Sequence, residues 1–127
     1  MSYYFSTQIE RPFEAALDDV KDALKQEGFG VLTEIDVKET LKKKLNVDFR
    51  NYRILGACNP PFAYQALEAE DKIGTMLPCN VIVQEQGGVV NVAAIDPVAS
   101  MQSVENPDLQ DVAKTIQKKL KTVIESL

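Results

Sequence analysis

The stretch V-I-V-Q-E-Q-G-G-V-V-N-V-A-A-I, residues 81–95, decides the fold class. Two apolar, β-branched runs, Val81 to Glu85 and Val89 to Ile95, flank Gln86-Gly87-Gly88. A Gly-Gly pair between such runs is typical of a two-residue β-hairpin, because glycine adopts the positive φ angles that these turns require. The sequence therefore predicts two antiparallel strands. In this register Gln86 faces Val89, and Cys79 faces Asp96.

Periodicity on either side of the hairpin predicts the remaining elements. Apolar residues at every second position from Tyr3 to Ile9 indicate a half-buried strand. Apolar residues three and four positions apart predict two long amphipathic helices, one from Pro12 to Gly28 and one from Asn106-Pro107 to Leu127. The other predicted elements are strands over 29–35 and 52–58, a short helix capped by Asp36 and Glu39, and a short helix opened by Asn59-Pro60 before Gly74.

Length and composition predict one globular domain over residues 1–127. The chain is 45% hydrophobic and 26% charged, which is ordinary for a packed domain. A formal net charge of -5 argues against nucleic acid as a partner, because phosphate binding needs clustered lysine and arginine. No apolar run is long enough to predict a membrane helix, and the first residues lack a basic start and a cleavage site, so we expect a soluble, cytoplasmic protein.

The reactive side chains are few. The sequence contains no histidine, which removes histidine-based triads and imidazole metal sites from consideration. It contains two cysteines, too few for a framework of disulfides. Each cysteine precedes an asparagine, giving Cys58-Asn59 and Cys79-Asn80. These two pairs are the chemistry-bearing motifs that the sequence offers.

Four segments carry a resemblance to a known family. They are L-K-K-K-L-N-V-D-F (Leu41 to Phe49), Y-R-I-L-G-A-C-N-P (Tyr52 to Pro60), L-P-C-N-V-I-V (Leu77 to Val83) and I-D-P (Ile95 to Pro97). In these segments the chain resembles the prokaryotic family called domain of unknown function 302, over nearly its whole length. The resemblance implies no established activity.

The resemblance implies an α+β fold similar to the TATA-binding protein. The expected core is a strand, a helix, four strands and a final helix. We therefore expect a largely antiparallel five-stranded sheet with two long helices on one face and two short helical excursions. The resemblance, rather than the periodicity, favours the antiparallel arrangement of the whole sheet.

The predicted site depends on that arrangement. If strand 52–58 and the strand after Cys79 are antiparallel, Cys58 and Cys79 meet at one sheet edge, where Asn59, Asn80 and Asp96 can add polar support. If the helix at Pro60 is a parallel crossover, the thiols lie roughly 17–20 Å apart.

Three functions compete for this site. The leading hypothesis is a non-catalytic domain that binds a small molecule or a soft metal ion such as Cu(I), held by Cys58 and Cys79 with Met101 as a third ligand. The first alternative is a thiol-dependent enzyme, in which a helix N-terminus activates Cys58 as the nucleophile. The second is a structural or interaction module that forms a homodimer. The simplest interpretation makes both cysteines small buried hydrophobes and Asn59 a helix cap.

Overall fold

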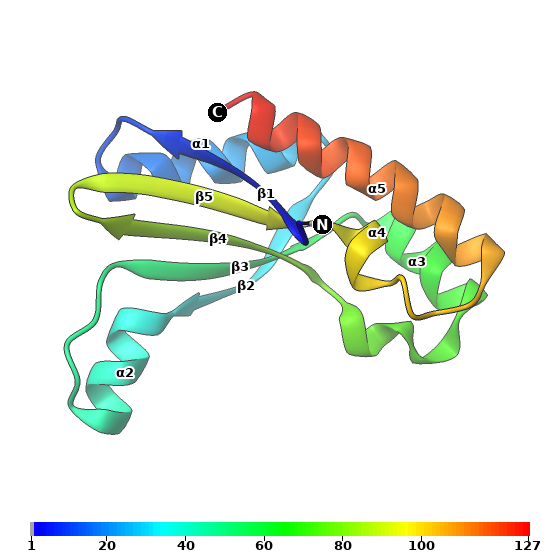
Figure 1. Ribbon diagram of the computed structural model, residues 1–127, viewed down its shortest axis with the longest axis horizontal. Coiled ribbons are helices and arrows are strands. Elements are labelled where there is room, and N and C mark those ends of the chain that lie inside the picture. The colour runs from blue at the N-terminus through cyan, green and yellow to red at the C-terminus, as the bar shows by residue number, and fades with distance from the viewer. Residues whose placement is uncertain (1) are drawn as a thin grey trace.

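The computed structural model describes residues 2–127, so Met1, the first residue of the predicted domain, lies outside the described part. Five strands and several helices follow the predicted order, as Figure 1 shows. The strands are β1 (Tyr4–Ile9), β2 (Gly30–Asp36), β3 (Tyr52–Cys58), β4 (Cys79–Gln86) and β5 (Val89–Ile95). The helices are α1 (Phe13–Gln26), α2 (Val37–Leu45), α3 (Pro60–Ala69), the 3-10 helix η1 (Asp71–Met76), α4 (Pro97–Ser100) and α5 (Pro107–Glu125).

The strands form one sheet in the order β1-β5-β4-β3-β2, and every neighbouring pair is antiparallel. The α+β class and the antiparallel sheet are therefore confirmed. The hairpin between β4 and β5 turns at Gly87 and Gly88, both with positive φ, and Gln86 pairs with Val89 as predicted. Between Val31 and Thr33, β2 contains a register shift that places Leu32 outside the regular pairing.

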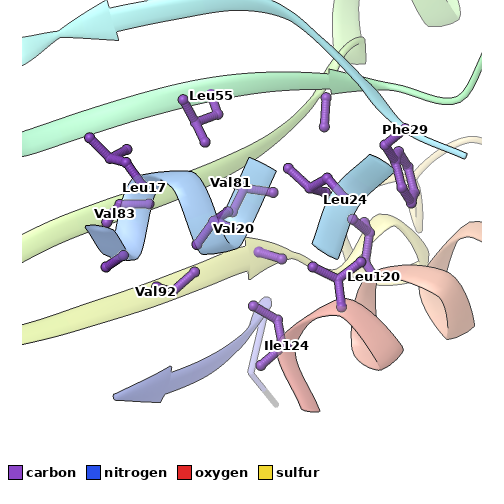
Figure 2. Close-up of a cluster of buried hydrophobic side chains, with 14 of the residues drawn as sticks. Leu17, Val20, Leu24, Phe29, Leu55, Val81, Val83, Val92, Leu120 and Ile124 are labelled. Atoms are coloured by element: carbon purple, nitrogen blue, oxygen red, sulfur yellow. The ribbon is translucent and has the colours of Figure 1, made fainter. Parts of the chain in front are cut away.

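The main core lies between the sheet and the two long helices. Alternate strand residues and the apolar stripes of α1 and α5 belong to one buried cluster, so both helices cover the same face. Figure 2 shows this cluster, which includes Leu17, Val20 and Leu24 of α1, Leu120 and Ile124 of α5, and Val81, Val83 and Val92 of the sheet. The opposite face of the sheet carries no such helical layer in the described part of the chain, and it is called the open face below.

The connections between strands are more helical than the sequence predicts. The segment after α3 contains η1, and Asp96-Pro97 opens the four-residue α4 rather than simply ending the hairpin. These elements pack with α5 around a second buried cluster that contains Ile73, Met101 and Leu109. In contrast, α2 has no buried residue. Figure 1 places α2 across the sheet from α5.

An ion-pair cluster joins α1 to strands β3 and β2, at the β2 edge of the sheet. Arg53 of β3 contacts Glu34 at 2.6 Å and Asp36 at 3.3 Å, both on β2, and lies 3.6 Å from Glu14 of α1. Lys21 of α1 contacts the other carboxylate oxygen of Glu34 at 2.8 Å. The hydrogen bond from Lys21, followed by that from Arg53, holds the pKa of Glu34 below its ordinary value.

Acid should therefore weaken the fold through Glu34. A carboxylate whose pKa is lowered in the folded state stabilises the protein above its unfolded pKa of about 4.3, and this contribution is lost as the pH falls. We expect Glu34→Gln to flatten the fall in unfolding free energy between pH 7 and pH 3, measured by urea denaturation. Glu68→Gln, at an exposed position of α3, is the control. An unchanged slope in Glu34→Gln would contradict the assignment.

Candidate functional site

The two cysteines lie at the same end of neighbouring strands, as the antiparallel prediction requires. Cys58 ends β3 and Cys79 begins β4, and Cys79 pairs directly with Ala57. Because residues paired across strands share a face and consecutive residues alternate, Cys79 faces the helices with Ala57 while Cys58 faces the open side. Both thiols are free. The structure brings the cysteines to one rim but divides them between the two faces of the sheet.

Cys79 is a buried member of the main core. Burial, and secondly the negative charge that Cys58 would carry as a thiolate, raises the pKa of Cys79 to about 11. The thiolate is the form that binds metals and attacks electrophiles. Cys79 is therefore in an environment that favours the unreactive neutral thiol.

Asn59 connects the start of α3 to the end of α1. Its backbone oxygen accepts from the amides of Phe62 and Ala63, so it occupies the N-cap position. The predicted helix cap is therefore present, but the side chain of Asn59 makes no capping bond, and Nδ2 instead donates to the Glu27 carbonyl at 3.1 Å. This contact sits beside Gly28, where φ is +86° and an added Cβ would lie 3.2 Å from Nδ2 of Asn59. Asn59 thus satisfies an orphan carbonyl at a helix C-terminus.

Both carboxylate oxygens of Asp96 make hydrogen bonds within the fold. The β4–β5 register, extended by two residues, places it opposite Cys79 as predicted. Its Oδ1 accepts from the amides of Val98 and Ala99, which caps α4, and both carboxylate oxygens accept from Nε2 of Gln117 on α5. The sequence could not reveal the partner Gln117, which lies 21 residues further along the chain.

Three of the predicted site residues line an apolar cleft between the sheet end and the helices. Asn59, Cys79 and Met101 meet there with Phe62 of α3 and Ile116 of α5. The cleft has a volume of about 30 Å³. Pockets for small organic ligands are roughly ten times larger or more. Cys58 and Asn80 are not part of this lining.

Asn80 lies on the open face, in a larger hollow. This hollow has a volume of about 400 Å³ and is formed by the surfaces of β1, β5, β4 and β3. Its lining combines tyrosine rings, amide side chains and small or branched apolar residues: Tyr3, Tyr4, Tyr52, Asn80, Ile82, Gln84, Asn91, Ala93, Ala94 and Ile95. The structure therefore divides the five predicted ligand contacts among a small apolar cleft, a helix cap and an open surface.

The strand register arranges the open face in three rows that run across the sheet. The middle row is the most apolar and consists of Ser6, Ala93, Ile82, Ile54 and Ile35. One flanking row consists of Tyr4, Ile95, Asn80, Gly56 and Thr33, and the other of Gln8, Asn91, Gln84 and Tyr52. In the first flanking row, a Cβ on Gly56 would lie 2.2 Å from the Thr33 hydroxyl, so glycine keeps these strands in close contact. An apolar centre with polar rows beside it is the usual anatomy of a protein interface.

Two further properties concern residues 2–127. Within them, no cluster of three or more histidine, cysteine, aspartate or glutamate side chains is placed to hold a metal ion. No helix in this range has both the length and the apolar character needed to cross a bilayer.

The comparison with protein families agrees with the segments quoted above. The family model described as "Domain of unknown function DUF302" matches residues 5–127. The chain belongs to the DUF302 family. A solved structure, the uncharacterized conserved protein DUF302 from Bacillus stearothermophilus, is similar with a TM-score of 0.91 and 28% sequence identity, over 98% of each chain. No curated protein matches the sequence.

The open face of this DUF302 domain differs from an ordinary solvent-facing sheet in its charge. The strands contain four charged residues, Glu34, Asp36, Arg53 and Glu85. All four point to the same face of the sheet as core residues such as Leu55 and Val83. They therefore lie on the helix-covered face or at its edges. Among the described residues, the three rows of the open face contain none. Antiparallel sheets with one solvated face normally place polar and charged residues on that face.

Proposed function

We propose that this DUF302 domain is a non-catalytic interaction module that forms a two-fold homodimer by burying its open face against that of a second copy. The observation that carries the proposal is the absence of charge from the three described rows of the open face, in a chain that is 26% charged. Exposed apolar patches that are bordered by polar residues, as the middle row is, mark interaction sites in globular proteins.

Three physical arguments favour a second copy as the partner. Each chain has a formal net charge of -5, so two copies repel least when they meet through an uncharged surface. Two sheets pack face to face about 10 Å apart in many stable domains. A two-fold interface must also complement itself, and an exposed amide such as Asn80 can donate to and accept from the same group in the other copy.

Ile35→Lys should weaken this dimer about 30-fold or more. Ile35 is in the apolar middle row and 48% exposed, so lysine can replace it in a free monomer with little strain. In the dimer the change introduces two charges, one from each copy, and an unpaired charge in an interface costs about 2 kcal/mol or more. Sedimentation equilibrium over a range of concentrations measures the dimer dissociation constant.

Leu67→Lys is the matched control for Ile35→Lys. Leu67 is 46% exposed and lies on α3, which packs beside α5 rather than on the open face. We expect its dimer dissociation constant to equal that of the wild type. Equal weakening by both substitutions, or weakening by Leu67→Lys alone, would place the interface elsewhere and end the proposal.

Small-molecule binding in the hollow of the open face is the second candidate function. It is favoured by the volume of about 400 Å³, which falls within the range of ligand pockets, and by three tyrosines beside amide groups. The ligand would be uncharged and partly apolar. Of the five ligand contacts predicted from the sequence, Asn80 is the one that lines this hollow. Native mass spectrometry of the purified protein tests it. A stoichiometric small molecule that Asn80→Leu removes would support the candidate, and ligand-free protein would count against it.

The cysteine-based hypotheses have less support from the geometry. Cys58 and Cys79 face opposite sides of the sheet, and Met101 is buried with Cys79 in a cleft of about 30 Å³. A soft metal ion bound by both thiols would require one side chain to cross its strand. Thiol catalysis would depend on Cys58 alone, since burial keeps Cys79 neutral.

A further inference from the structure

The open face alone has a small flat footprint for a dimer interface. Five strands spaced about 4.8 Å apart and three rows of side chains spaced about 6.7 Å apart cover about 480 Å². Stable protein interfaces bury about 800 Å² on each partner. Contacts from another part of each chain would enlarge an interface that is centred on the open face.

The helix α2 is placed to supply that area. It lies across the sheet from α5 in Figure 1. The segment that follows it runs along the end of the open face, where Nε of Arg50 donates to Oε1 of Gln84 at 2.8 Å. The ring of Phe49 lies 6.2 Å from that of Tyr52. Gln84 and Tyr52 both belong to the open face, so α2 and its connection border the same surface.

Local contacts define both ends of α2, which contributes no buried residue to the core, and anchor the segment that follows it. Asp36 Oδ1 accepts from the Glu39 amide at the start of the helix, and Asn46 ends it in the left-handed conformation with φ of 52°. The amide and side chain of Glu85 on β4 bond to the backbone and side chain of Asn51. With nine residues α2 extends about 13 Å.

The apolar residues of α2 are only partly used within the chain. Val37 and Leu41 are half-buried, whereas Leu45 is 66% exposed and Val47, just beyond the helix, is 45% exposed. Leu45 is the last residue of α2, and Val47 follows two residues later, so both are at the end of the helix opposite to β2.

We infer that α2 is a dimer clasp, in which Leu45 and Val47 of each copy pack on the margin of the other copy's sheet. This inference rests on the proposed function and names the second contact surface of that dimer. The open face supplies the apolar centre of the interface. The two clasps enlarge the interface at opposite positions related by the two-fold axis.

Leu45→Gln tests the clasp without adding charge or a poor helix former. We expect the dimer dissociation constant, measured by sedimentation equilibrium of the full chain, to rise about tenfold, because a buried leucine is lost twice in each dimer. Val47→Gln, just outside the helix, should have a smaller effect in the same direction. Tyr64→Gln is the matched control, since Tyr64 is 67% exposed on α3 and should leave the constant unchanged.

The possible results separate the clasp from the proposed function. An unchanged dissociation constant in both Leu45→Gln and Val47→Gln, together with dissociation by Ile35→Lys, overturns the clasp and leaves the open-face dimer intact. A wild-type chain that stays monomeric at hundreds of micromolar overturns both. Far-ultraviolet circular dichroism of each variant as a monomer checks that α2 is still folded, and weakening that accompanies loss of helix in both variants counts against the clasp.

Discussion

Replacing Leu120 with alanine should lower the free energy of unfolding by about 2–5 kcal/mol. Leu120 lies on α5 and is fully buried between the sheet and α1, within the main core. Alanine removes the buried methyl groups and leaves a cavity, because surrounding side chains collapse only partly. Domains of this size are stable by about 5–15 kcal/mol, so the loss is a large share of the total. Urea denaturation followed by circular dichroism measures it.

Leu45→Ala provides the control for the core prediction, provided that unfolding is measured at a concentration where the protein is monomeric. Leu45 is mostly exposed, so the substitution should change the unfolding free energy by less than about 0.5 kcal/mol. A loss below 1 kcal/mol in Leu120→Ala would mean that α5 is not packed against the sheet in solution. Such a result would undermine the arrangement that defines the open face.

Cys79 should react with iodoacetamide at least a hundredfold more slowly in the folded protein than in urea. With a pKa of about 11, only about one Cys79 thiol in a thousand is ionised at pH 8, compared with about one in four for an ordinary cysteine. Burial against the core further restricts access to the sulfur atom. Peptide mass spectrometry after timed quenching reports the rate at each cysteine separately.

The pH dependence of labelling provides an independent check on Cys79. In the folded protein its rate should continue to rise up to about pH 11, because the burial that raises the pKa disfavours the thiolate below that value. Fast labelling of Cys79 below pH 8 in folded protein would contradict its assignment as a core residue. That result would return the thiol-enzyme and soft-metal hypotheses to the first rank.

The sequence predicted the elements whose stability is mainly local. The Gly87-Gly88 turn determined the register of β4 and β5, and the apolar stripes of α1 and α5 identified the helices that cover the sheet. At Asp36 the predicted cap is present. In each case the determining residues are close together in the sequence.

Contacts between segments that are far apart in the sequence could not be predicted from it. Asn59 donates to Glu27, 32 residues earlier, and Gln117 binds Asp96, 21 residues earlier. The sequence also could not predict which faces of the sheet the two cysteines occupy. A shift of one residue in the register of β3 and β4 would have placed them on the same face. Twenty residues separate Cys58 from Cys79, and their conformation determines that register.

The open face, however, had a signal that was overlooked. Alternate residues of three predicted strands are uncharged: Tyr52, Ile54 and Gly56; Asn80, Ile82 and Gln84; Asn91, Ala93 and Ile95. The charged residues Arg53 and Glu85 lie at the intervening positions, whose side chains point to the same face as the core residues. A half-buried strand with its charges on the buried side indicates that the other side is also covered.

Hydroxyl-radical footprinting at two concentrations tests the buried open face most directly. Tyr4 and Tyr52 lie on that face, whereas Tyr64 is exposed on α3 and serves as an internal control. The proposal predicts that oxidation of Tyr4 and Tyr52 falls when the wild-type protein is concentrated above its dimer dissociation constant, while oxidation of Tyr64 stays the same. Dimer formation with unchanged oxidation of Tyr4 and Tyr52 would contradict it.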